Sequence, residues 1–217
     1  MFRSTRRPVV FPQSEHARLA GTIALAWGND LFARPALPFD AFVRGVTLHD
    51  RGYDPFDADG IGEVPSDRWA AIQRASFAPR GEEPVVDLIV ALHVHRLVSS
   101  VDETVLGPMT AQLPELHRAA GVDESAAAEA DRITDLCDRI AFDFCVEEAT
   151  SGRVAVAPAR GTDPVAVVYT VDGYGEITLA PWPFGLPRLS GIMLGFRAER
   201  YPDQLEPVVV PFEARPG

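Results

Sequence analysis

The sequence predicts an α+β fold, in which a mostly helical core is followed by a small C-terminal antiparallel β region. Up to about residue 150, apolar side chains recur at helical spacing. After Ser151 they alternate instead, and glycines and prolines interrupt the pattern without any helical period. We therefore expect a helical part over 1–150 and a strand-rich part over 151–217 that packs on it.

The helical part is expected to follow one short strand, RPVVF (7–11), which could pair with the C-terminal strands to make a single α+β unit. N-cap residues, apolar periodicity and breaks at glycine and proline then predict the helices. Their expected ranges are about 14–31, 41–50, 66–76, 84–100, 109–120 and 123–150.

Two of these helices carry further information. The fourth is apolar nearly all round, which indicates that it is buried. The last contains both cysteines, Cys137 and Cys145, whose separation along one helix is roughly 12 Å. That is too far for a disulfide, so we expect two thiols in the core.

Four strands are expected in the C-terminal part. Two alternating runs, VAVVYTV and GEITLAPW, flank the turn VDGYGE and predict a hairpin. The segments GIMLGFRAERY and PVVVPFEA are expected to add two more strands.

The composition excludes several classes of function. The 217 residues contain 31 acidic side chains and 20 basic ones, all of them arginine. Without lysine there is neither a Schiff-base lysine nor a Walker A lysine. A net charge of −11 opposes binding to nucleic acid. We find no apolar segment typical of a signal peptide or a membrane span, so we expect a cytoplasmic protein that does not bind membranes.

The chemically informative residues are histidines and aspartates on separate predicted helices. His49 and Asp50 end the second helix, and Gly52 supplies a corner from which two neighbours could reach one ion. Imidazole and carboxylate together suit a divalent transition metal, namely zinc, manganese or iron. An isolated His-Asp pair is common by chance, but His16 and Asp138 on other helices add weight to this one.

The order His16, His49-Asp50, Asp138 resembles the HD superfamily of metal-dependent hydrolases. Five segments across the chain are also similar to one bacterial family, domain-of-unknown-function family 3891. These segments are QSEHARLAGTIALAW, LHDRGYDPFD, VALHVHRL, LCDRIAFDFC and ITLAPWPF.

The HD resemblance implies a metal held by His16, His49, Asp50 and Asp138, and hydrolysis of a small phosphate ester or anhydride. We expect arginines to bind the phosphate oxygens of such a small anionic substrate. The candidates are Arg18, Arg51 and Arg96.

Other residues have two interpretations each. His93 matches a family histidine and could be a second-metal ligand, a contact for a substrate phosphate, or a buried core histidine. His95 points about 200° away on the same helix. His117 could complete a two-metal set or face solvent. Asp54 could activate water, as an acidic residue after the pair does in HD nucleotidases, or could simply form a loop before Pro55.

Two rival functions follow from these alternatives. The first is a di-iron oxygenase on the same scaffold, which would need His93 and His117 as further ligands. The second is a non-catalytic binding module, expected if His16, His49 and Asp138 lie more than ~8 Å apart, since metal–ligand bonds are near 2 Å. The oligomeric state is left open, with a homodimer as one option.

Overall fold

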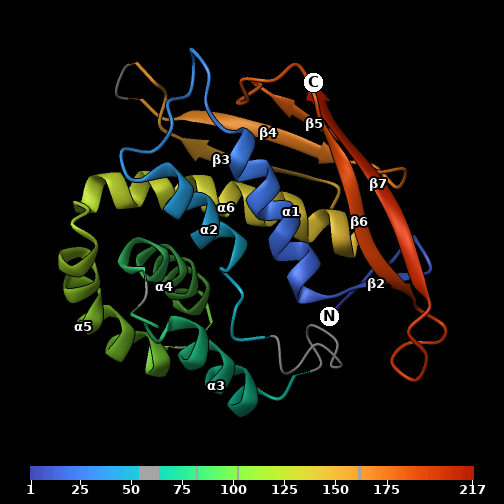
Figure 1. Cartoon of the computed structure of the whole chain (residues 1–217), viewed down its shortest axis with the longest axis horizontal. Coiled ribbons are helices and arrows are strands. Elements are labelled where there is room, and N and C mark those ends of the chain that lie inside the picture. Colours follow the sequence, from blue (N-terminus) through green and yellow to red (C-terminus); the bar gives the residue numbers. More distant parts are fainter. Residues whose placement is uncertain (54–63, 82, 102, 161–162) are drawn as a thin grey trace.

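The computed structural model describes residues 1–53, 64–81, 83–101, 103–160 and 163–217. Figure 1 shows their arrangement, with helices on one side of a curled sheet. The helices are α1 (Gln13–Ala26), α2 (Phe39–Thr47), α3 (Ser66–Phe77), α4 (Pro84–Ser99), α5 (Glu103–Ala120) and α6 (Glu124–Val146). None of these described helices is long and apolar enough to cross a membrane.

The strands of the described residues form one mixed sheet of seven in the order β1-β2-β6-β7-β5-β4-β3. Strands β5 and β7 pair in parallel, and every other neighbouring pair is antiparallel. The strands are β1 (Phe2–Arg3), β2 (Val9–Phe11), β3 (Ser151–Val156), β4 (Val165–Val171), β5 (Glu176–Ala180), β6 (Leu189–Arg197) and β7 (Pro207–Pro216).

The predicted fold class, a helical HD-like core with a small C-terminal β region, is wrong. Strands come from both ends of the chain, because β1 and β2 precede the first helix and β2 pairs with β6. The expected pairing of the N-terminal strand is confirmed, but β1 and β3 were not predicted. A two-residue strand such as β1 carries no alternation that a sequence pattern could reveal.

A single hydrophobic cluster joins the sheet to the helices. Apolar residues of α1, α2 and α6 pack against the inner faces of the strands. Phe144 of α6, Phe11 of β2 and Phe212 of β7 belong to this cluster and are fully or nearly fully buried. Cys137 and Cys145 are free thiols within this cluster, as expected. Helices α3, α4 and α5 and the start of α6 enclose a second apolar cluster. Residues on both sides of position 150 therefore share one core.

The crossing of α1 and α2 depends on a glycine. A Cβ atom on Gly21 would lie 2.0 Å from Thr47 Oγ1 and 3.2 Å from Thr47 Cα, so the two helices touch at this point. We expect Gly21→Ala to lower the free energy of unfolding by about 1–3 kcal/mol, because a side chain added to a filled contact must push the helices apart. Urea denaturation measures this change.

Gly107 provides the matched control for this prediction. It lies in α5, and a Cβ atom there would meet no atom within 4 Å. Gly107→Ala is expected to raise the free energy of unfolding by about 0.5–1 kcal/mol, since alanine is the better helix former. Equal effects of the two substitutions would show that the α1–α2 contact is not as tight as the structure has it.

Candidate metal centre

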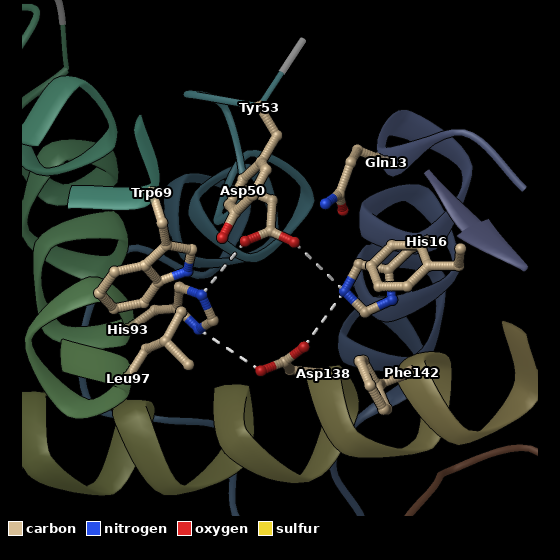
Figure 2. A pocket seen from close by; sticks show the side chains of 10 residues that line it. Gln13, His16, Asp50, Tyr53, Trp69, His93, Leu97, Asp138 and Phe142 are labelled. Carbon is tan, nitrogen blue, oxygen red and sulfur yellow. Dashed lines mark ion pairs between the residues drawn. The ribbon is translucent and has the colours of Figure 1, made fainter. Parts of the chain in front are cut away.

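Four separate segments bring histidines and aspartates to one cavity (Figure 2). His16 comes from the first turn of α1, His93 from the middle of α4 and Asp138 from α6. His49 and Asp50 lie just after α2, whose helix ends at Thr47 and not at Asp50 as the sequence suggested. The predicted corner is therefore present, and it lets the two neighbours face the same point.

The corner after α2 is held against α3. The Gly52 backbone N–H donates to Ser76 Oγ at 2.9 Å. A Cβ atom on Gly52 would lie 2.1 Å from that oxygen and 2.7 Å from the carbonyl oxygen of Ile72. Only glycine allows this approach, and the approach fixes where His49 and Asp50 point.

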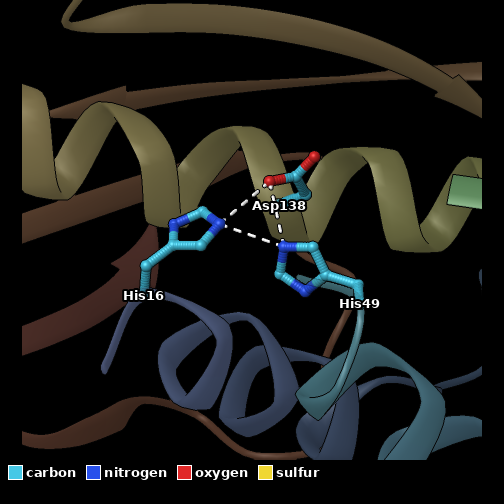
Figure 3. A group of neighbouring side chains, drawn as sticks. All are labelled: His16, His49 and Asp138. Atoms are coloured by element: carbon cyan, nitrogen blue, oxygen red, sulfur yellow. Dashed lines mark hydrogen bonds and ion pairs between the residues drawn. The ribbon is translucent and has the colours of Figure 1, made fainter. Parts of the chain in front are cut away.

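The nitrogen and oxygen atoms of the cluster lie close together. The Nε2 atoms of His16 and His49 are 3.0 Å apart. Asp138 Oδ1 is 3.1 Å from the first and 3.4 Å from the second (Figure 3). Asp50 Oδ2 is 3.5 Å from both. The distance of more than ~8 Å expected for a non-catalytic module is therefore not observed.

These separations suit one bound ion. With metal–ligand bonds of about 2.0–2.2 Å, neighbouring ligand atoms lie about 2.8–3.6 Å apart, from octahedral to tetrahedral geometry. The five distances of 3.0–3.5 Å that join His16 Nε2 and His49 Nε2 to each other, to Asp50 Oδ2 and to Asp138 Oδ1 fall in this range. Donor atoms of His16, His49 and Asp138 all lie within 4.8 Å of one another, and so do those of His49, Asp50 and His93. Two neutral imidazoles and two carboxylates form a donor set suited to zinc, manganese or iron.

The two histidines of the set are oriented in different ways. His49 Nδ1–H donates to the backbone carbonyl of Val46 at 2.7 Å, which leaves Nε2 facing the cluster. Such an outer hydrogen bond is typical of metal-ligating histidines. His16 Nδ1 has no hydrogen-bond partner among the described residues. The His16 ring packs instead on Phe2, with ring centroids 4.6 Å apart.

The imidazoles and carboxylates of the cluster shift one another's pKa values. Burial would lower the pKa of His49, but the carboxylates of Asp50 and Asp138 outweigh it and raise the pKa to about 9. Burial opposes ionisation of Asp50 and Asp138, yet hydrogen bonds and the nearby imidazoles lower the pKa of both carboxyls. Burial and the charge of His49 lower the pKa of His93.

The cavity above the cluster is small and largely aromatic. Its volume is about 170 Å³. Trp69 and Leu97 lie beside His93, whereas Phe142 lies beside His16 (Figure 2). Among the described residues no arginine lines it.

The arginines that we expected to bind substrate contact the protein instead. Arg51 is 5% exposed, and its guanidinium donates to Asp87 and to the carbonyl oxygens of Ser76 and Ala78. Each of its nitrogens is already paired, which favours a structural role, and its contact with a phosphate stays a prediction.

Arg18 and Arg96 are also engaged elsewhere. Arg18 pairs with Glu15 and donates to the Ile192 carbonyl, so it covers a stretch of β6 that β2 leaves unpaired. The Arg96 guanidinium contacts Asp131, Asp135 and His93 Nδ1. Neither arginine lines the cavity, so their predicted contact with substrate lacks a geometric basis.

The other predicted aspartates and histidines do not join the cluster where the structure describes them. Asp143 accepts a hydrogen bond from Tyr169, so Asp138 is the aspartate of α6 that joins the cluster. His95 contacts Thr110 on the exposed side of α4. The ring of His117 contacts the Val122 carbonyl at the end of α5, and its position does not support a two-metal set. Asp54 lies outside the described residues.

Several cavity residues were not predicted. These are Phe2, Gln13, Tyr53, Trp69, Leu97 and Phe142. Gln13 and Tyr53 fall within QSEHARLAGTIALAW and LHDRGYDPFD, two of the segments that carried the family resemblance. Their proximity to His16 and to the His49-Asp50 pair was the signal available in the sequence.

The comparison with known families agrees with the resemblance of these segments. A sequence model of the family described as "Protein of unknown function (DUF3891)" matches residues 2–191. The chain belongs to this family. No curated protein and no solved structure matches the chain. The match to DUF3891 covers all of the cluster residues and the strands from β1 to β5, but it names no activity.

The raised pKa of His49 predicts how this DUF3891 member would bind zinc as the pH changes. Below about pH 9 the imidazole of the metal-free protein holds a proton that a metal must displace. We expect the apparent zinc affinity to increase from pH 7 to pH 9, by up to about tenfold per pH unit for one displaced proton, and to level off above that. Competition titration with a chromophoric chelator measures it. An affinity that is constant from pH 7 to pH 9 would contradict the prediction.

Proposed function

We propose that this protein is a metal-dependent hydrolase of the HD type, acting on a small phosphate ester or anhydride. The observation that carries the proposal is that His16 Nε2 and His49 Nε2 lie 3.0–3.5 Å from each other and from oxygens of Asp50 and Asp138. Their order along the chain is that of the HD superfamily.

A metal bound by these residues would lower the pKa of a water molecule and polarise the substrate phosphate. In hydrolysis the water oxygen bonds to phosphorus, the bond to the leaving oxygen breaks, and that oxygen takes up a proton. Within the described residues, the cavity offers His93 and Gln13 as polar groups beside the metal ligands.

The shape and charge of the site restrict the substrate. A cavity of about 170 Å³ among the described residues suits a small group. Without an arginine among its described lining residues, the negative charge of a phosphate would be balanced by the metal itself. The net charge of −11 also repels polyanions at long range.

The proposal is tested by adding zinc, manganese or iron(II) to metal-free protein and following hydrolysis of p-nitrophenyl phosphate and bis(p-nitrophenyl) phosphate. We expect at least one metal to support turnover that Asp138→Asn lowers by at least about 100-fold, because that variant loses a charged ligand. His95→Gln is the control, since His95 lies on the exposed side of α4. A wild type that binds metal but hydrolyses neither ester any faster than Asp138→Asn would contradict the proposal.

A further inference from the structure

His93 occupies the wall of the cavity opposite His16 (Figure 2). It is 2% exposed, so each ring nitrogen requires a partner or a ligand. Its Nε2 atom lies 3.4 Å from Asp50 Oδ1, and its Nδ1 atom lies 3.5 Å from Asp138 Oδ2. Both contacts are long for hydrogen bonds, and they do not reveal which nitrogen carries the proton.

The contact with Arg96 indicates which ring nitrogen of His93 carries the proton. Its NH2 group lies 3.2 Å from His93 Nδ1. A guanidinium nitrogen always carries hydrogen and can only donate, so Nδ1 must be the acceptor. The proton of the neutral imidazole is then on Nε2, which has no hydrogen-bond partner among the described residues and faces the cavity.

The position of Arg96 is itself fixed by two carboxylates of α6. Its Nε lies 3.2 Å from Asp131 Oδ2, and its NH1 lies 2.7 Å from Asp135 Oδ1. Both carboxylates belong to the helix that carries Asp138. The guanidinium thus connects α6 to α4 and presents its remaining nitrogen to His93.

We infer that Arg96 holds His93 in the tautomer that is protonated on Nε2, so that His93 is a hydrogen-bond donor in the cavity and not a metal ligand. A metal would need the lone pair of a ring nitrogen. Nδ1 uses its lone pair on Arg96, and Nε2 carries the proton. The Nε2–H group can therefore donate to an oxygen atom of a substrate. Arg96 is a positioning residue that acts through His93.

This inference rests on the proposed function for its metal and substrate, but the tautomer can be measured without either. Long-range proton–nitrogen NMR spectra of ¹⁵N-histidine-labelled protein distinguish a protonated ring nitrogen from an unprotonated one. We expect His93, assigned by loss of its signals in His93→Gln, to be protonated on Nε2 in metal-free protein and to stay so after zinc is added. Protonation on Nδ1, or a zinc-dependent shift of a His93 nitrogen to the coordinated range, would overturn the inference.

Substitution of Arg96 provides the second readout. Arg96→Met should move the proton to Nδ1, where Asp138 Oδ2 can accept it, and should leave the Nε2 lone pair free. Arg139→Met is the matched control, because Arg139 also pairs with Asp135 but makes no contact with His93 in the described structure. Equal effects of the two variants on the tautomer would overturn the role of Arg96.

The outcomes separate this inference from the proposed function. If wild-type protein binds no zinc but His93 is protonated on Nε2 and responds to Arg96→Met, the hydrolase proposal fails and the role of Arg96 stands. If zinc binds and His93 coordinates it, the hydrolase proposal survives and the inference is wrong.

Discussion

His49→Ala is expected to abolish stoichiometric metal binding. The variant loses the Nε2 atom that lies within 3.0–3.5 Å of donor atoms of His16, Asp50 and Asp138. Loss of an outer-shell partner already weakens metal binding by about 10- to 100-fold, so loss of a direct ligand should weaken it by more than about 100-fold. Elemental analysis after gel filtration should find about one zinc per wild-type chain and close to none in the variant.

Two further variants make this result specific. His49→Gln keeps most of the buried side-chain volume and should lose zinc in the same way. His95→Ala removes a histidine whose ring contacts Thr110 on the exposed side of α4, and it should keep wild-type zinc content. If His49→Ala and wild type hold equal zinc, the ion is bound elsewhere and the assignment of the centre is wrong.

Arg51→Met is expected to produce the largest loss of stability. The side chains of Arg51 and Asp87 are 2% and 4% exposed, and their closest atoms are 2.8 Å apart. Removing the guanidinium leaves a buried carboxylate and two carbonyl oxygens without this donor. Breaking a buried ion pair in this way costs about 3–5 kcal/mol. Urea denaturation at pH 7 measures the change in the free energy of unfolding.

An exposed pair serves as the comparison. Arg44 and Glu83 also lie 2.8 Å apart, but their side chains are 54% and 38% exposed. Arg44→Met should therefore cost less than about 1 kcal/mol. If Arg51→Met were equally mild and instead changed catalysis, Arg51 would be a substrate ligand, as the sequence first suggested.

The helical part of the fold was predictable because its signals are local. Proline, glycine and apolar periodicity identified all six described helices, with ends that differ by up to six residues. The sheet was harder, because strand pairing joins segments far apart in the chain. The pairing of β2 with β6 connects residues near position 10 to residues near 197, and no local pattern specifies the large sheet that results.

The cluster was predictable from the types and order of its residues. His16, His49 and Asp138 are brought together by α1, the corner after α2, and α6, and Asp50 lies beside them at the same corner. Gly52 signalled that corner, although the sequence did not reveal that the approach of Ser76 requires it.

The roles of the arginines were not predictable. In the sequence, Arg51 stands beside the predicted ligand Asp50, and this proximity suggested contact with substrate. In the structure the neighbouring side chains of a tight corner diverge, so Arg51 points to Asp87 while Asp50 points to the cavity. Similarly, Arg96 reaches His93 only because Asp131 and Asp135 on α6 hold it there.

The most direct test of the metal centre is a crystal grown with zinc and measured on both sides of the zinc absorption edge. We expect one anomalous peak about 2.0–2.2 Å from Nε2 of His16, Nε2 of His49 and one oxygen each of Asp50 and Asp138. A map with no peak among these four side chains in zinc-soaked crystals, or with the zinc bound by other residues, would contradict the account.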